Sequence, residues 1–264
     1  MIACCNSETG VTIASYRKQE KKKTMIESIY KKEILTAPSL CDYSGRLSIP
    51  DVFALLMDLA TEHADNLNIG LKVLSKQDLY WIAVKTKVHI AERPSMGETI
   101  TAETWPEKPK GVRCVRDYTL AKDGKIFVTA KTEWAVMNMK TGQIQRADNI
   151  YPPELVINEA KVMPEAFARF DNEPFDEIIG EYIVRSVDID IGRHMNNTAY
   201  LRAFFGLLSI EQRRQACISD IEVYYKSQCY EGDRLTFMKK TKDDKTIVQA
   251  FLPDGRAAIQ IVLS

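Results

Sequence analysis

Residues 188–209 read DIDIGRHMNNTAYLRAFFGLLS, and this stretch decides how the second half of the chain folds. It links an expected strand around residues 182–184 to an expected helix. Tyr200, Phe204, Leu207 and Leu208 are spaced i, i+4, i+7 and i+8, so they predict one buried stripe on that helix.

The link before this helix is polar and carries Asp190, His194, Asn196 and Asn197. Asn is a preferred N-cap residue because its side chain accepts a hydrogen bond from a free helix N–H. The loop therefore brings an acid, a base and backbone donors to one helix N-terminus, which can stabilise an oxyanion. A plain capped helix behind a polar turn fits the same spacing.

Composition excludes several classes of protein. The 264 residues are 45% apolar and carry 36 basic and 36 acidic side chains, so no global field favours nucleic acid. With three His and no C-x-x-C pair, no metal site is expected. The six cysteines indicate reduced thiols in a cytoplasmic protein, and they are Cys4, Cys5, Cys41, Cys114, Cys217 and Cys229.

No apolar run approaches the roughly 20 residues that span a bilayer, so no membrane partner is expected. Residues 1–24 have a short apolar start followed by a basic cluster, the reverse of a secretory signal. They are predicted to be a disordered leader, which places the natural start at either Met1 or Met25.

The expected elements repeat. The first half predicts a strand at 28–35, a helix opened by Pro50 and capped by Ser48, and strands at 79–91, 98–105, 114–121 and 125–139. Asp123-Gly124 joins the last two strands as a hairpin turn. The second half predicts a strand at 219–228 and a hairpin at Asp254-Gly255, so the same landmarks recur in the same order.

Each unit is one long helix with an antiparallel sheet that wraps around it, and two such sheets can pair to cover their edges. The prediction is an α+β tandem, or double, hot-dog fold. Its expected parts are the leader 1–24, an N-terminal hot-dog 25–150, a Pro-rich linker 151–179 with a short helix, and a C-terminal hot-dog 180–264.

The repeat bears on the chemistry. It aligns Gly192-Arg193 with Gly45-Arg46, which puts His194 opposite Leu47 and Asn196-Asn197 opposite Ile49-Pro50. On this alignment the first copy lacks the polar groups, so the chemistry is expected once, in the second half. His63 is expected in the core or a pocket wall, and His89 in solvent. The motifs G-x-S-x-G and G-x-G-x-x-G are absent, and no cofactor is expected.

From about Met25 onwards the chain resembles the acyl-acyl-carrier-protein thioesterases of plant plastids and bacteria. The resemblance rests on the order of several short motifs: residues 44–47 (SGRL), 79–82 (LYWI), 104–106 (TWP), 116–118 (RDY), 133–136 (EWAV), 187–190 (VDID), 194–200 (HMNNTAY) and 221–225 (IEVYY).

The resemblance implies hydrolysis of fatty acyl-acyl-carrier-protein (acyl-ACP) thioesters in fatty acid biosynthesis, with acyl carrier protein as partner. The family loop Asp-x-Asn-x-His is matched by Asp190 and His194, but Gly192 replaces the Asn. Gln228-Cys229 stands where the family has Glu-Cys.

The implied roles follow from these matches. The helix N-terminus at Asn197 binds the oxyanion, and His194 and Asp190 orient or deprotonate water. Gln228 can hold that water, whereas Cys229 is a nucleophile only if it is reachable and electropositive. The acyl pocket is expected in the first half, with wall residues Met57, His63, Trp81 and Trp134. A basic rim would receive the carrier protein: Arg193, Arg202, Arg213, Arg214 and Lys226.

Three other functions fit the same fold: an acyl-CoA thioesterase, a non-catalytic acyl-binding module and a hot-dog dehydratase. The acyl chain length stays open. A single chain supplies the doubled sheet, which is compatible with a monomer or a homodimer.

Overall fold

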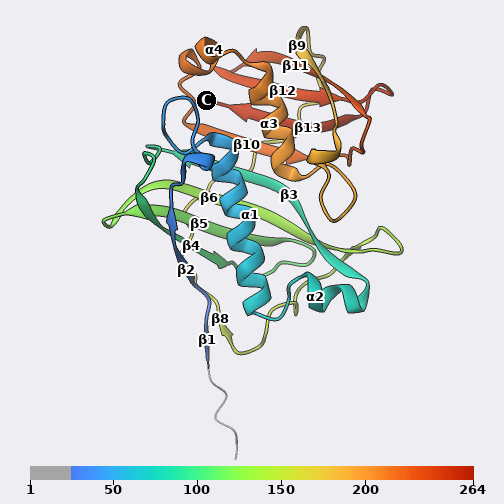
Figure 1. Ribbon diagram of the computed structural model, residues 1–264. Coiled ribbons are helices and arrows are strands. Elements are labelled where there is room, and N and C mark those ends of the chain that lie inside the picture. The colour runs from blue at the N-terminus through green and yellow to red at the C-terminus, as the bar shows by residue number, and fades with distance from the viewer. Residues whose placement is uncertain (1–24) are drawn as a thin grey trace, which may run out of the picture.

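The computed structural model describes residues 25–264. The predicted leader, residues 1–24, lies outside this range. The first unit contains one long helix and five main strands (Figure 1): β2 (Tyr30–Leu35), α1 (Ile49–Asn66), β3 (Leu79–Ile90), β4 (Thr99–Pro106), β5 (Cys114–Lys122) and β6 (Lys125–Asn138). Short helices η1 (Pro38–Leu40), α2 (Leu71–Leu74) and η2 (Ser75–Gln77) and the short strand β7 (Ile144–Gln145) complete it.

The second unit repeats the order strand, helix, four strands, which confirms the predicted repeat of elements. Its elements are β9 (Glu177–Ile183), η3 (Ser186–Asp188), α3 (Asn197–Leu207), α4 (Ile210–Gln215), β10 (Asp220–Tyr225), β11 (Arg234–Lys242), β12 (Lys245–Phe251) and β13 (Ala257–Leu263). The first predicted strand begins at Tyr30 instead of residue 28. The strand predicted at 219–228 ends at Tyr225, so Gln228 and Cys229 lie in the loop that follows it.

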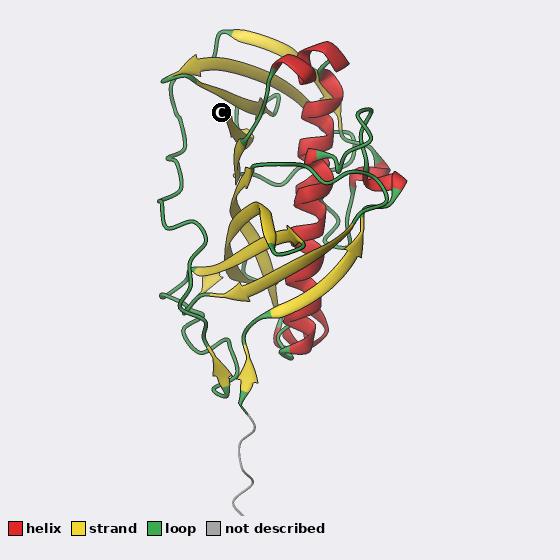
Figure 2. Ribbon diagram, turned by 90° about the vertical axis from the view of Figure 1, so that its left-hand side faces the viewer, coloured by secondary structure: helices red, strands yellow, loops and turns green. Residues whose placement is uncertain are grey.

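The two units share one sheet of the order β2-β4-β5-β6-β3-β10-β13-β12-β11-β9. They join where β3 pairs antiparallel with β10, with Val88 opposite Ile221. The helices α1 and α3 lie on one face of this curved sheet, which wraps around them (Figure 2). This arrangement confirms the predicted double hot-dog fold.

The core lies between the helices and the concave face of the sheet. On α1, Val52, Leu56 and Leu59 are buried, and Ser48 caps the helix by accepting a hydrogen bond from the Asp51 N–H. On α3, Tyr200 and Phe204 are buried, and the Phe204 ring stacks on Phe237 with centroids 6.3 Å apart. Each such side chain contributes about 1.5–3 kcal/mol by its burial.

Strand β3 departs from the simple alternation that its sequence suggests. Thr86, Val88 and Ile90 are buried in alternation, but Ala83 is buried in place of Val84. The register with β6 shifts between Ala83 and Lys85, which marks a β-bulge. One extra residue in a strand exchanges the two faces from that point on, so the pattern changes phase there.

The connecting segment between the units contains no helix, so the short helix predicted there is wrong. Its only regular element is β8 (Leu155–Val156), which pairs with β1 (Ile26–Glu27). The rest runs extended along the face of the sheet opposite the helices (Figure 2). Side chains of the sheet bind its carbonyls: Trp105 Nε1 donates to Ala160 O at 2.9 Å and Lys131 Nζ to Met163 O at 2.8 Å.

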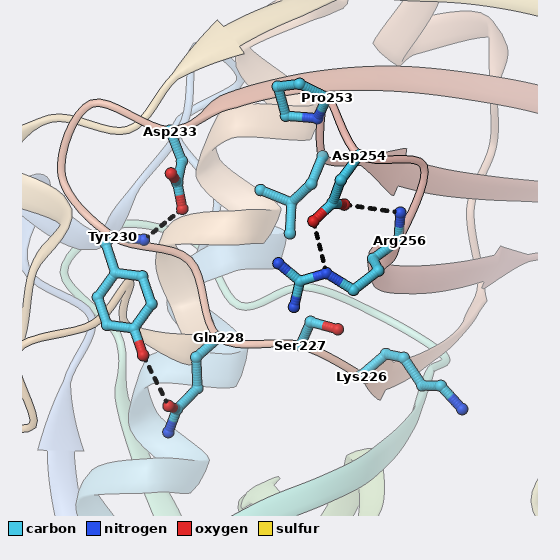
Figure 3. Close-up of a pocket in the computed structure, with 9 residues that line it drawn as sticks. Lys226, Ser227, Gln228, Tyr230, Asp233, Pro253, Asp254 and Arg256 are labelled. Atoms are coloured by element: carbon cyan, nitrogen blue, oxygen red, sulfur yellow. Dashed lines mark hydrogen bonds and ion pairs between the residues drawn. The ribbon is translucent and has the colours of Figure 1, made fainter.

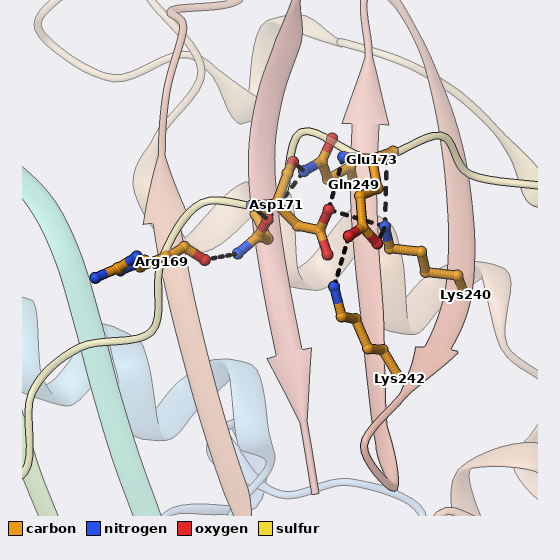
Figure 4. Close-up of polar contacts among 7 residues, drawn as sticks. Arg169, Asp171, Glu173, Lys240, Lys242 and Gln249 are labelled. Atoms are coloured by element: carbon orange, nitrogen blue, oxygen red, sulfur yellow. Dashed lines mark hydrogen bonds and ion pairs between the residues drawn. The ribbon is translucent and has the colours of Figure 1, made fainter.

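Buried amides hold the segment to the second unit (Figure 4). Gln249 Nε2 donates to the Asp171 carbonyl at 2.6 Å, and the Asp171 N–H donates to Gln260 Oε1 at 2.7 Å. Lys240 pairs with the Asp171 carboxylate at 2.8 Å, with both side chains nearly buried. The two amides thus satisfy both backbone groups of Asp171 without a helix.

Within residues 25–264, no helix is both long enough and apolar enough to cross a membrane. The same residues contain no group of three or more His, Cys, Asp or Glu side chains that could hold a metal ion.

Candidate active site

The loop before α3 is a tight turn built around Asp190. The Asp190 N–H donates to His194 O at 3.1 Å, and the Arg193 N–H donates to Asp190 O at 2.9 Å. The Asp190 carboxylate accepts from the Gly192 N–H at 2.7 Å. Arg193 has φ 61°, a left-handed conformation that closes the turn. The turn brings the His194 side chain back over Asp190.

His194 Nδ1 lies 3.9 Å from Asp190 Oδ1, and both side chains are partly buried. The ring lies against Gly192: a Cβ on this residue would be 2.7 Å from His194 Nε2 and 3.0 Å from Asp190 Oδ1. The histidine therefore fills the space that an Asn side chain would need. This packing gives a physical reason for glycine at position 192, where the family pattern has Asn.

The start of α3 supplies one free backbone donor. Asn196 is the N-cap, and its Oδ1 accepts from the Thr198 N–H at 2.9 Å and from Thr198 Oγ1 at 2.8 Å. The Ala199 N–H donates to Asn196 O at 2.9 Å. The first N–H groups of a helix have no acceptor within the helix, so Asn197 is left with an unused donor. The predicted helix start at Asn197 is confirmed.

Gln228 and Cys229 lie beside this loop because the Met195 N–H donates to Cys229 O at 2.7 Å. The Cys229 side chain is completely buried, and burial raises the pKa of its thiol. The thiol is thus neither reachable nor ionised, which argues against a nucleophilic role. Gln228 is exposed, and its Oε1 accepts from Tyr230 Oη at 3.3 Å.

A polar pocket of about 520 Å³ lies next to Gln228 (Figure 3). Its wall is charged, with Arg256 Nε donating to Asp254 Oδ2 at 2.7 Å. Of the predicted catalytic residues, only Gln228 lines it. The lining is Lys226, Ser227, Gln228, Tyr230, Asp233, Leu252, Pro253, Asp254 and Arg256. A second cavity of about 270 Å³ lies between β2 and α1.

The first unit contains the same turn. There the Asp42 N–H donates to Arg46 O and the Gly45 N–H to Asp42 O, both at 2.9 Å. The Ser44 N–H donates to Asp42 Oδ1 at 2.9 Å. These bonds equate Asp42 with Asp190, Arg46 with His194 and Ser48 with Asn196.

The alignment predicted from the sequence is therefore wrong by one residue. It matched Gly45 with Gly192, but the residues that share the left-handed conformation are Gly45, with φ 68°, and Arg193, with φ 61°. His194 stands opposite Arg46 instead of Leu47. Asn196 and Asn197 stand opposite Ser48 and Ile49.

The first copy also keeps its polar groups, which corrects the prediction that it lost them. Asp42 pairs with Arg93, and Arg46 Nη1 donates to Arg93 O at 3.0 Å. Burial tends to raise the pKa of Asp42, but hydrogen bonds from Ser44 and Arg93 outweigh it and hold the pKa below its ordinary value. What the first copy lacks is a histidine.

Arg93 and Gln228 occupy equivalent positions. Leu47 N–H donates to Pro94 O at 2.9 Å, just as Met195 N–H donates to Cys229 O. The residue before Pro94 is Arg93, and the residue before Cys229 is Gln228. The first loop thus has an arginine bound to its aspartate, where the second has a neutral amide.

The predicted wall residues Met57, His63, Trp81 and Trp134 all belong to the first unit. His63 is buried, and its ring stacks on Tyr30 with centroids 5.6 Å apart. Burial, with a smaller effect of the Arg116 charge, lowers the pKa of His63 to about 3, so the ring is neutral. Trp81 Nε1 donates to Ile69 O at 2.9 Å, whereas Trp134 Nε1 is buried without a hydrogen-bond partner.

The His89 side chain is exposed to solvent, as predicted, and it also has a partner. Its Nδ1 lies 2.9 Å from Asp220 Oδ1, the residue directly opposite on β10. It helps join the two units on the outer face of the sheet and lies on a different strand from the loop of His194.

Most of the predicted basic rim is engaged within the chain. Arg202 pairs with Asp51 at 2.9 Å, and Arg214 with Glu211 at 3.2 Å. The Arg213 guanidinium lies 5.2 Å from the Tyr43 ring centroid, and Lys226 Nζ lies 4.9 Å from that of Phe170.

The family follows from comparison with known proteins. Residues 27–153 match the acyl-ACP thioesterase N-terminal domain, and residues 172–254 match the acyl-ACP thioesterase C-terminal domain. The chain belongs to the acyl-ACP thioesterase family.

Its similarity to individual members is distant. A chloroplastic acyl-acyl-carrier-protein hydrolase of Cuphea viscosissima is 24% identical over 190 residues, which cover 68% of this chain and 46% of that protein. A chloroplastic oleoyl-acyl carrier protein thioesterase of Arabidopsis thaliana is 20% identical over 238 residues, covering 83% of this chain and 65% of that one. The chain spans about half the length of the first relatives it matches.

Solved structures agree on the fold. An acyl-ACP thioesterase from Bacteroides thetaiotaomicron superimposes with a TM-score of 0.77 at 22% identity, covering 89% of this chain and 96% of that one. The 12:0-ACP thioesterase from Umbellularia californica gives 0.74 at 19% identity, with the same coverage.

Proposed function

We propose that this protein hydrolyses fatty acyl-ACP thioesters and releases free fatty acids in fatty acid biosynthesis. The observation that carries the proposal is the family match over both units. The loop of Asp190 and His194 at the start of α3 supports it, because it places an acid, a base and a backbone donor together.

In this mechanism the Asn197 N–H binds the thioester carbonyl oxygen as it becomes an oxyanion. His194, oriented by Asp190, takes a proton from the attacking water. The water oxygen adds to the carbonyl carbon, the thiol of the carrier leaves with a proton, and the carboxylic acid is the other product. Gln228, across the loop, holds the water through its amide. Cys229 shapes the loop through its carbonyl instead of acting as a nucleophile.

The division of labour follows the two units. The first, residues 25–150, holds the acyl chain between α1 and the sheet, with Met57, His63, Trp81 and Trp134 as its wall. The second, residues 180–264, holds the catalytic loop, and residues 151–179 connect them. The acyl carrier protein docks on a basic rim. Of the five predicted residues of that rim, only Arg193 has no side-chain contact described above. Because one chain supplies the whole sheet, a second copy is not needed to complete the fold.

The test is thiol release from a panel of acyl-ACP thioesters of increasing chain length, with the matching coenzyme A thioesters measured in parallel. Faster release from the carrier-linked substrates, with an optimum chain length, is expected. Release only from the coenzyme A thioesters would mean that the protein is a thioester hydrolase whose substrate is acyl-coenzyme A and not acyl-ACP. Acyl binding without release from either series would leave an acyl-binding module.

A further inference from the structure

Four cations gather on the outer face of the sheet, where the two units meet, and no acid pairs with any of them. Lys85 and Lys87 lie on β3, Lys226 directly follows the end of β10, and Arg169 belongs to the connecting segment that crosses this face (Figure 2). None of the ion pairs found among residues 25–264 includes one of the four. These four residues are called the seam patch below.

Aromatic rings position two of these cations without neutralising them. Lys85 Nζ lies 4.7 Å from the ring centroid of Tyr224 and 5.7 Å from that of Phe167. Lys226 Nζ lies 4.9 Å from the centroid of Phe170, whose edge meets the Tyr224 ring at 5.2 Å. A ring attracts a cation through its quadrupole but carries no net charge. The seam patch is therefore held in place and stays positive.

The acids on the neighbouring strands are engaged elsewhere. Glu222 on β10 lies directly opposite Lys87 in the sheet, but its Oε1 accepts a hydrogen bond from the Ala168 N–H. Glu133 on β6 pairs with Arg113. The chain as a whole has equal numbers of basic and acidic side chains, so the positive charge of the seam patch is a local feature of the folded surface.

The seam patch borders the polar pocket beside the catalytic loop. Lys226 and Gln228 both line this pocket of about 520 Å³ (Figure 3). Gln228 directly precedes Cys229, whose carbonyl accepts a hydrogen bond from the Met195 N–H at 2.7 Å. A continuous surface thus leads from the cations through the pocket to the loop that carries His194.

The other predicted docking residues offer less free charge. Arg202 on α3 pairs with Asp51, and Arg214 on α4 pairs with Glu211. By contrast, the exposed Arg169 contributes only its carbonyl to the contacts of the connecting segment, and its side chain points away from them (Figure 4). An unpaired cation interacts more strongly with an approaching anion than one that already has an acidic partner.

We propose that the acyl carrier protein docks on the seam patch and that its prosthetic arm reaches the catalytic loop through the polar pocket. This inference rests on the proposed function for the identity of the partner. Four unpaired cations complement an acidic protein surface, which speeds association and fixes the orientation of the partner. The arm contains amide groups, and the pocket offers it the polar side chains of Ser227, Tyr230 and Arg256.

The experiment measures binding without requiring turnover. Acyl carrier protein whose arm holds the acyl chain through an amide, which is not cleaved as the thioester is, is titrated into the full chain by calorimetry. Arg169→Glu combined with Lys226→Glu should raise Kd about tenfold or more at low salt, and the effect should shrink as salt is added. The matched control is Lys72→Glu combined with Lys76→Glu, which makes the same change in charge on exposed residues of α2 and η2 (Figure 1).

An unchanged Kd in the variant of Arg169 and Lys226 would overturn the proposal. A larger loss in Arg213→Glu combined with Arg214→Glu would overturn it as well, because the carrier would then dock on α4. Vesicles of anionic phospholipid are tested in parallel, since cations beside aromatic rings also suit a membrane surface. Vesicle binding that the seam patch variant loses, without any binding of the carrier, would replace the docking site by a membrane-binding surface.

Thiol release separates this inference from the proposed function. The ratio of kcat/KM for acyl-ACP to that for acyl-pantetheine should fall about tenfold in the seam patch variant and stay constant in the control. If the carrier binds through the seam patch and neither thioester is cleaved, the proposed hydrolysis fails and the docking site stands. If acyl-ACP is cleaved with the same ratio in the seam patch variant, the hydrolysis stands and the docking site fails.

Discussion

The loops before α1 and α3 have the same backbone and different chemistry. In both, an aspartate accepts the same backbone hydrogen bond and a left-handed residue closes the turn. Three of their differences bear on the chemistry: Gly192 stands in place of Ser44, His194 in place of Arg46, and Gln228 in place of Arg93. In the first loop Arg93 pairs with the Asp42 carboxylate. In the second loop His194 lies beside the Asp190 carboxylate. The turn is a folding device common to both units, and the catalytic potential comes from these replacements.

The largest effect is expected from removing the histidine. His194→Ala should lower kcat/KM for an acyl-ACP thioester by about 10²–10⁴-fold, because the general base is lost. Arg46→Ala, the matched change in the first loop, should leave turnover nearly unchanged. Steady-state kinetics together with circular dichroism melts would check this. Equal losses in both variants would mean that the loops contribute only structure.

A methyl group at Gly192 should lower turnover by about 10–100-fold. Its Cβ would meet His194 Nε2 at 2.7 Å, so the ring must move, and small displacements of a catalytic group are costly. The counterpart Ser44→Ala keeps its Cβ and should leave kcat unchanged. The measurement is kcat for both variants at saturating substrate. Wild-type kcat in Gly192→Ala would show that the position of the ring is not critical.

Exchanging Arg93 and Gln228, one at a time, separates an effect on stability from an effect on activity. Arg93→Gln removes the partner of a partly buried carboxylate and should lower the free energy of unfolding by about 1–3 kcal/mol at pH 7, with turnover unchanged. Gln228→Arg should instead lower turnover about tenfold, because the new cation would compete with His194 for Asp190.

The loss of stability expected for Arg93→Gln depends on pH. The pKa of Asp42 is held below its ordinary value in the folded protein, so its stabilisation is complete above the ordinary aspartate pKa of about 3.9 and is lost as pH falls through the folded value. Urea unfolding of natural protein and Arg93→Gln at several pH values should therefore converge in acid. A difference that is constant with pH would contradict the role of the ion pair.

The last comparison concerns the outer face of the sheet. Under the connecting segment the first unit buries Asp117, whereas the second buries the neutral Gln249 and Gln260. Burial, and to a lesser degree the Glu107 charge, raises the pKa of Asp117 to about 7. Because the folded pKa exceeds the unfolded one, stability from this group is present below pH of about 4 and is lost as pH rises towards 7.

Asp117→Asn should remove that decline. The variant should gain about 1–3 kcal/mol relative to the natural protein between pH 5 and pH 8. Urea unfolding at both pH values measures it, with the exposed Glu33→Gln as control. Parallel pH profiles for Asp117→Asn and the natural protein would contradict the assignment.

Local patterns predicted much of the fold and part of the site. The caps at Ser48 and Asn196, the hairpin at Asp123-Gly124 and the element order of both units are set by residues close together in sequence. The pairing of Asp190 with His194 is also local, since four residues separate them and one turn brings them together.

Other features depend on contacts between distant residues. The connecting segment is extended because Trp105, Lys131 and Gln249 supply hydrogen bonds from the sheet, which its own proline-rich sequence does not reveal. The bulge at Val84 and the buried thiol of Cys229 arise from strand register and packing.

The two loops differ in a way that the sequence alone did not predict. Matching glycines misaligned the copies by one residue, because the left-handed position is Gly45 in one loop and Arg193 in the other. By itself the sequence determined the duplicated fold, since periodicity and turn residues act over short distances. Only the tertiary structure decided that Arg93 binds the first aspartate and that His194 occupies the space above Gly192, because each depends on which side chains the folded sheet brings together.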